Sequence, residues 1–398
     1  MPIPSTSEAW VEYSKEVSRV LAANRDVWGE EVMARPEGPT FENMKSYLLP
    51  QRYVDAPFRY YPIVLSLKDG REKVWLVSNG SEIGLSINPR RRRNSWDPAE
   101  VRVSFLLGRD EEPYGQDAER VSGPTYLDGY LPIVRSSYTK QNVQYDQEVF
   151  ATALAGQGDK LSVYVHLSAL PLDDAPKSAQ VTIHLDVERG TLFQLDDVIA
   201  YGPGSCRSTG VCCQFSVGGA FDRAINRLTY TLDLSDSERQ DIFLMLPNES
   251  ARIKVKPLDA ARYTAARDRT VAYWNDILAA GTQIEVPEEV VNSALRALVI
   301  GIFMLVNGDE MRYSFGNSYD RPWMAECGDA IMALAMLGYS EDARRYLEWY
   351  FPYKDYVQAI YHHDNGYKLQ FGSQYYFLFR DRSFIEENLD LWTQACEF

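Results

Sequence analysis

The spacing of hydrophobic residues changes along this sequence, and the change constrains the order of its secondary structure. Between about residues 50 and 258, apolar residues alternate with polar ones in short runs separated by Gly, Asp and Pro. No helix-length pattern separates the runs, which predicts antiparallel strands in sheets packed face to face and excludes a parallel sheet with crossover helices. The predicted strands are 63–67, 74–77, 83–87, 101–107, 149–154, 161–170, 181–187, 228–234 and 242–246.

The first two of these runs predict a hairpin. Asp69-Gly70 lies between them, and this dipeptide favours the positive φ angles of a tight primed turn. The strand-rich region is also about twice as long as an immunoglobulin-type module of about 100 residues. We therefore expect a broad, many-stranded antiparallel β-supersandwich.

Helical spacing surrounds this region. Residues 8–34 predict a lead-in helix, and residues 259–280, which stop before Gly281, predict a linker helix. Further helices are predicted over 287–303, 322–337, 340–350, from 373 and over 383–395.

The chain accordingly divides into four predicted segments, with β structure first and α structure second. They are a helical lead-in (1–48), the β-supersandwich (49–258), the linker helix (259–284) and the first hairpins of a helical layer (285–398).

Composition and charge argue against several kinds of partner. The net charge of −15 argues against nucleic acid, since a phosphate backbone is bound by clustered basic residues, and the run Arg90–Arg93 is interpreted as a solvated loop. No apolar stretch reaches the roughly 18 residues of a membrane span, so a soluble protein without a membrane partner is expected. No signal peptide is visible, which favours the cytoplasm, or secretion if the N-terminus is incomplete.

The five cysteines have no regular spacing, so neither a disulfide framework nor a metal site is expected. No cofactor is predicted, and the oligomeric state is left open.

The segment Asp309–Asp329 is rich in the groups that bind sugars. Sugar binding combines polar hydrogen-bonding groups with aromatic planes, and glycosidic cleavage needs positioned carboxyl groups. Glu326 and Asp329 are three residues apart and would share one helix face. Alternatively they only offset the helix dipole, with Arg321 paired to Asp320. The candidate residues here are Tyr319, Asp320, Arg321, Trp323, Glu326 and Asp329.

A second candidate segment, Tyr361–Gln374, also precedes a predicted helix start. It contains His363 and Asp364, and Asp364-Asn365-Gly366 predicts a turn. Two adjacent histidines cannot face the same way on a strand, so we expect no metal pair at His362 and His363. If the helices alternate in direction, this segment and the first one lie on the same side of the bundle and share a pocket.

Three stretches of the sequence resemble a known family. VPEEVVNSALRALV, YDRPWMAECGDAIMALAMLGYSEDARRYLEW and GSQYYFLFRDRSFIEENL are similar to sequences of the six-hairpin glycosidases, the α/α toroid enzymes that include bacterial glucoamylases, α-L-rhamnosidases and sugar phosphorylases. The resemblance implies an (α/α)6 toroid behind an N-terminal supersandwich. Only the first hairpins fit into residues 285–398, which predicts a truncated toroid, and in glucoamylase-like members the catalytic carboxylates lie later.

The resemblance also assigns residues. Trp323 and Asp329 look like the aromatic residue and the Asp of the family's second helix start, where an Arg-Asp pair holds the sugar, and Gly328 stands where the Arg would be. Asp320 and Glu326 look partly like the acidic motif of α-L-rhamnosidases, in which a carboxylate is the general acid.

The expected function is a glycoside hydrolase that acts on an oligo- or polysaccharide by carboxylate general acid/base chemistry. Glu326 is the expected acid. The expected sugar-binding residues are Tyr319, Asp320, Arg321, Trp323, Asp329, His363 and Asp364. The alternatives are a sugar phosphorylase on the same architecture and a non-catalytic carbohydrate-binding protein. A polysaccharide lyase ranks lower, because there the helices precede the sheets.

Overall fold

The computed structural model describes residues 7–23, 25–40, 62–85, 101–154, 160–187, 190–201, 210–236, 238–248, 257–312, 322–352 and 363–397. They belong to two compact units, Met1–Pro62 and Ile63–Phe398. The first unit contains helices α1 (Ser7–Ala23) and α2 (Val27–Met33). The single lead-in helix predicted over residues 8–34 is therefore wrong. Asp26 caps the second helix by accepting a hydrogen bond from the Gly29 amide at 2.9 Å, which starts a new helix there.

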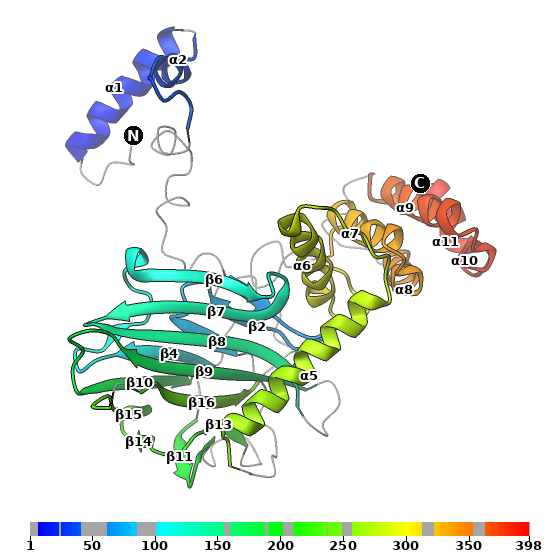
Figure 1. The fold of residues 1–398 in the computed structure, drawn as a ribbon. Helices are drawn as coiled ribbons and strands as arrows, with labels where there is room; N and C mark the ends of the chain where they lie inside the picture. Colours follow the sequence, from blue (N-terminus) through cyan, green and yellow to red (C-terminus); the bar gives the residue numbers. More distant parts are fainter. Residues whose placement is uncertain are drawn as a thin grey trace. The chain divides into compact units, whose positions relative to one another are not determined.

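The second unit begins with two antiparallel sheets (Figure 1). The first sheet has the strand order β1-β2-β3-β4-β10-β15-β14, with β5 beside β4. Its strands are β1 (Pro62–Leu65), β2 (Val74–Val77), β3 (Glu82–Leu85), β4 (Val101–Leu107), β5 (Glu112–Pro113), β10 (Ser178–Val187), β14 (Ala220–Asp222) and β15 (Arg227–Asp233).

The second sheet has the order β11-β12-β13-β16-β9-β8-β7-β6. Its strands are β6 (Val121–Leu127), β7 (Leu131–Lys140), β8 (Val143–Ala153), β9 (Leu161–Pro171), β11 (Leu192–Leu195), β12 (Val198–Tyr201), β13 (Val211–Phe215) and β16 (Gln240–Pro247). A short 3-10 helix, η2 (Ala118–Arg120), precedes β6.

One hydrophobic core joins the inner faces of the two sheets. It contains Phe105 of β4 and Ile183 of β10 from the first sheet, and Tyr138 of β7 and Val165 of β9 from the second, all fully buried. Antiparallel sheets that share a core in this way form a sandwich. The predicted fold class, β structure followed by α structure, is confirmed.

The helical region comprises α5 (Ala260–Ala279), α6 (Glu289–Leu305), α7 (Met324–Met336), α8 (Ser340–Tyr350), α9 (His363–Phe379), α10 (Arg382–Glu387) and α11 (Leu389–Cys396). Asp259 caps α5 by accepting from the Arg262 amide at 2.8 Å. None of the described helices combines the length and the apolar character that a bilayer span needs.

A second hydrophobic core lies between these helices and the outer face of the second sheet. Ile133, Phe150 and Tyr164 leave the sheet on this side and pack with Tyr263 of α5. The stacked rings of Phe150 and Tyr164 are 5.5 Å apart and meet the Tyr263 ring edge-on. The second sheet is therefore buried on both faces over part of its area.

Two predicted helix boundaries are wrong. The helix expected from Ser373 begins at His363, so Asp364-Asn365-Gly366 is helical and forms no turn. Packing outweighs the local turn preference here, because Lys368 and Phe371 are buried and Asp364 pairs with Lys368 one turn later. The last predicted helix, 383–395, is broken into α10 and α11 at Asn388.

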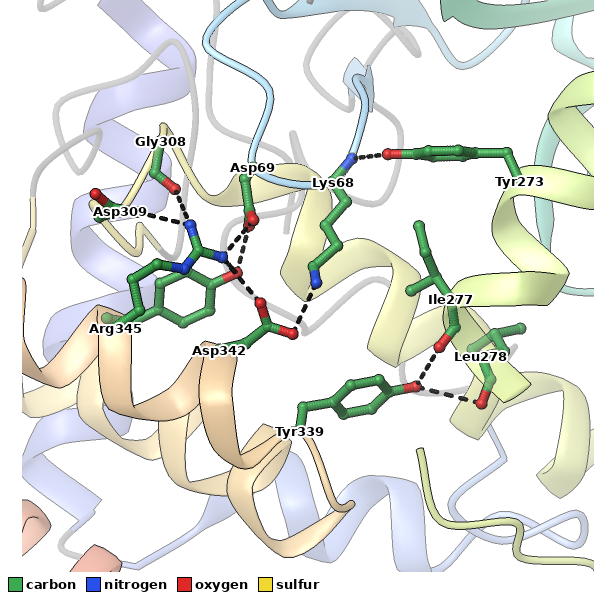
Figure 2. A network of polar contacts seen from close by, with 11 residues as sticks. Lys68, Asp69, Tyr273, Ile277, Leu278, Gly308, Asp309, Tyr339, Asp342 and Arg345 are labelled. Carbon is green, nitrogen blue, oxygen red and sulfur yellow. Dashed lines mark hydrogen bonds and ion pairs between the residues drawn. The ribbon is translucent and has the colours of Figure 1, made fainter. Parts of the chain in front are cut away.

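A polar network ties the β1–β2 connection to the helices, and we call it the hairpin anchor (Figure 2). Its centre is Arg345 of α8, which donates to Asp69 at 2.5 Å, to Asp309 at 2.6 Å and to Asp342 at 2.9 Å. Lys68 pairs with Asp342 at 2.7 Å.

The hairpin formed by β1 and β2 agrees with the sequence prediction, but its connection is longer than a tight turn. The connection spans residues 66–73, and only Asp69 of the Asp-Gly pair has a positive φ, 57°.

Tyr346 completes the hairpin anchor from a fully buried position. Its hydroxyl donates to Asp69. Burial, followed by the charge of Asp69, raises the pKa of Tyr346 well above its ordinary value, so the phenol is a neutral donor over the working range of the protein. Removal of Asp69 would leave this buried donor without its acceptor.

We expect Asp69→Ala to lower the free energy of unfolding by about 1–3 kcal/mol more than Asp196→Ala does. Asp196 is the matched control because it also has a positive φ, 52°, and its side chain is exposed, so both variants share the backbone strain of Ala in that conformation. Urea unfolding of the two variants measures the difference. Equal losses would show that the hairpin anchor contributes no stability.

Candidate functional site

The structure describes part of the site predicted from the sequence. Tyr319, Asp320 and Arg321 lie outside the described residues, as does the basic run at 90–93. The backbone of His363 is the first residue of α9, and its side chain lies outside the description. The predicted site residues whose side chains are described are Trp323, Glu326, Asp329 and Asp364.

Glu326 and Asp329 lie together on the exposed face of α7. The opposite face is buried and includes Met324, Cys327 and Ile331. Neither carboxylate makes an ion pair with a residue in the described part of the chain. Two acidic groups one turn apart, both open to solvent, are available to a ligand at the start of this helix.

The Cys327 thiol lies beside these carboxylates, on the buried face of α7. Burial raises its pKa to about 12, so it stays a thiol at neutral pH and is excluded as a nucleophile. The indole Nε1 of Trp323, just before the helix, is also buried and finds no acceptor among the described residues.

The start of α9 presents an ion pair. The Asp364 carboxylate lies 3.0 Å from the Lys368 ammonium, and their side chains are 15% and 5% exposed. Tyr367 stacks on Phe371, with ring centroids 5.9 Å apart. Asp364 is thus already engaged, and no described contact joins it to Glu326 or Asp329.

The helices α7 and α9 start at the same end of the helical layer. Near its start, α7 meets the middle of α9, because a Cβ atom at Gly328 would lie 2.2 Å from the Phe371 ring. Tyr375 lies one turn after Phe371 in α9, and its hydroxyl donates to the carbonyl oxygen of Ser340, which lies beyond the C-terminal end of α7. The two helices therefore run in the same direction, as expected for hairpins that alternate.

Gly328 fits this packing for a steric reason. The Phe371 ring occupies the space into which any side chain at position 328 would project. The family Arg that the resemblance would place at this position does not fit beside Phe371.

A second polar site, which the sequence reasoning did not identify, lies on the outer face of the second sheet. The strand register aligns Arg135, Glu148, His166 and Phe243 in one row across β7, β8, β9 and β16. The next row contains Ser137, Asp146, Ser168 and Asp241. Side chains aligned in this way share one face of the sheet.

These rows and the N-terminal half of α5 line an open cleft with a volume of about 610 Å³, here called the sheet cleft. Its lining includes Arg135, Asp146, Glu148, His166, Arg239, Asp241, Tyr263 and Arg267. On the sequence these polar residues look like the solvent-facing positions of ordinary strands. Only the register, which a single sequence does not reveal, brings them together.

Comparison with known proteins gives distant structural likeness and no sequence match. No known protein family matches the sequence, and no curated protein matches it. Among solved structures, the chain is similar to a human-microbiome protein provisionally described as a kojibiose phosphorylase, with 7% sequence identity and a TM-score of 0.38. The match covers 83% of this chain and 56% of that chain, so this chain spans little more than half of the other's length.

We expect Gly328→Ala to destabilise the protein by about 1–3 kcal/mol, because the added methyl group overlaps the Phe371 ring. Gly301 of α6 is the matched control. It is also inside a helix but has open space around it, so Gly301→Ala should instead stabilise the protein by about 0.5–1 kcal/mol through helix propensity. Thermal unfolding of both variants tests this contrast. A Gly328→Ala protein as stable as Gly301→Ala would contradict the packing of α7 on α9.

Proposed function

We propose that this protein acts on carbohydrate, as a glycoside hydrolase whose reaction takes place where α7 and α9 begin. The observation that carries the proposal is the common end of these two helices, with the exposed carboxylates of Glu326 and Asp329 on the first turns of α7. The resemblance of residues 285–398 to six-hairpin glycosidases supports the same assignment.

The chemistry follows from the roles that glycosidic cleavage requires. One carboxyl group protonates the leaving oxygen, and a second carboxylate activates water or attacks the sugar carbon. We assign the acid role to Glu326. Asp329, on the same helix face, holds sugar hydroxyl groups together with Trp323.

A sugar phosphorylase is the second candidate, and one feature favours it. Phosphorylases need positive charge beside the sugar, and Arg312 and Lys368 both belong to this end of the helical layer. Arg312 acts electrostatically on Cys327 at the start of α7 and pairs with Glu310 at 2.9 Å. Lys368 lies one turn into α9.

We expect Glu326→Gln to lower kcat by about 10²–10⁴-fold on the glycoside that the wild type cleaves best, because an amide cannot protonate the leaving group. Glu341→Gln is the matched control, since Glu341 is also an exposed glutamate in the first turn of a helix, α8, at the opposite end of α7. Release of free sugar from a panel of methyl glycosides, whose alkoxide leaving group departs only when it is protonated, measures kcat. Unchanged turnover in Glu326→Gln would remove Glu326 from the reaction.

Product analysis separates the candidate functions. Release of free sugar without added phosphate supports the hydrolase. A sugar 1-phosphate that forms only when inorganic phosphate is present supports the phosphorylase. Oligosaccharide binding without any turnover supports a non-catalytic carbohydrate-binding protein and contradicts both enzymes.

A further inference from the structure

The sheet cleft has the size and the pre-formed lining of a ligand site. A volume of about 610 Å³ lies within the range of 300–1,000 Å³ found for small-molecule sites. Most of its lining residues stand on four strands and one helix, and Arg239 directly precedes β16. The cleft lies on the sandwich and shares no residue with the proposed reaction site on α7.

Part of the lining only attaches α5 to the sheet. The Glu148 carboxylate accepts from Arg135 at 2.7 Å, from Arg267 at 2.9 Å and from the Tyr263 hydroxyl at 2.9 Å. Its side chain is 12% exposed. With three donors on its two oxygens, Glu148 is engaged in holding the helix and is not the group that a ligand would meet.

On the other side of the cleft, Asp241 and Arg239 keep hydrogen-bonding positions that the described fold does not use. Asp241 is 41% exposed, and one of its oxygens pairs with His166 Nε2 at 2.7 Å. Arg239 is 44% exposed and donates through one nitrogen to Asp146 at 2.8 Å. Within the described residues, the second oxygen of Asp241 and the remaining N–H groups of Arg239 form no hydrogen bond or ion pair, although a guanidinium has five donors.

The partners of Arg239 and Asp241 are themselves held by neighbouring side chains. Asp146 also accepts from Ser137 at 2.6 Å and from Gln144 at 2.7 Å, which fixes the partner of Arg239. His166 is stacked on Phe243, with ring centroids 4.8 Å apart, and this fixes the partner of Asp241. Groups held before binding lose little conformational freedom when a ligand arrives.

One strand of these rows carries a buried polar group that is not part of the cleft lining and that the described fold leaves unsatisfied. Ser168 lies in register between Asp146 and Asp241, is 1% exposed, and its hydroxyl has no hydrogen-bond partner in the described part of the chain. Buried hydroxyl groups normally have a partner. The row that carries Asp146 and Asp241 thus also carries a buried hydroxyl without a partner among the described residues.

The charge of the cleft indicates the kind of ligand. Arg135, Arg239 and Arg267 oppose Asp146, Glu148 and Asp241, so the two signs are equal in number. A balanced site does not select an anion or a cation, and it offers donors and acceptors side by side. A neutral polyol fits this pattern, because a sugar hydroxyl donates to a carboxylate while it or its neighbour accepts from a guanidinium.

We propose that the sheet cleft binds a segment of a neutral oligosaccharide through Arg239 and Asp241, away from the reacting bond. This inference rests on the proposed function as a carbohydrate-active protein, and it assigns that protein a second sugar site on the sandwich. The cleft holds the longer substrate, whereas a short glycoside needs only the α7 end.

The test compares two double variants of the whole chain. Arg239→Gln with Asp241→Asn removes the two most open charges on the Arg239 side of the cleft. As the control, Arg382→Gln with Glu386→Gln removes one charge of each sign from a more exposed pair on α10, 83% and 60% exposed. Isothermal titration with maltohexaose, cellohexaose and laminarihexaose measures binding, with hexagalacturonate as the acidic comparison. We expect the wild type to bind at least one neutral hexaose, and the cleft variant to bind it about tenfold more weakly or worse, with the α10 variant unchanged.

Glu326→Gln separates this inference from the proposed function. It should keep hexaose binding at the cleft while losing turnover of a methyl glycoside, and the cleft variant should keep the kcat for that methyl glycoside. Loss of hexaose binding in Glu326→Gln but not in the cleft variant would overturn the cleft and leave the reaction site standing. The inference also fails if the wild type binds no neutral hexaose, or binds only hexagalacturonate.

Discussion

The outer face of the second sheet is the surface on which the rest of the second unit depends. On this face, neighbouring rows of side chains are two residues apart along each strand, and an apolar row is followed by polar rows. Ile133, Phe150 and Tyr164 form an apolar row that packs under the helices, and the rows headed by Arg135 and Ser137 follow it. Because side chains alternate between faces, a slip of one residue in any of these strands would exchange the helix-binding row for core residues.

The position of the candidate reaction site follows from how the helices attach to the sandwich. The hairpin anchor fixes the start of α8, and Tyr339 just before it donates to the Ile277 carbonyl at the end of α5 at 3.1 Å. The start of α8 and the end of α7 are thereby held at the sandwich side. The start of α7, with Glu326, lies at the other end of that helix.

The order of β and α structure could be predicted from the sequence, because the spacing of apolar residues that distinguishes strands from helices involves only residues close together in the chain. It misplaced the start of α9, since the turn preference of Asp364-Asn365-Gly366 is local and the burial of Lys368 and Phe371 is not. It also could not reveal the sheet cleft. Asp146 and Asp241 are far apart in the chain, and only strand pairing through β9 brings them into one row.

Residue type alone therefore does not identify a functional carboxylate in this protein. Glu148 has three donors, and Asp342 pairs with both Lys68 and Arg345, so both are engaged in holding elements together. Glu326 and Asp329 are exposed without an ion pair among the described residues, and Asp241 keeps one oxygen open. A carboxylate that the fold already satisfies has little left to offer a ligand, since a new partner must displace an existing one. The carboxylates that the fold leaves open are the ones to which a ligand can bind without breaking the structure.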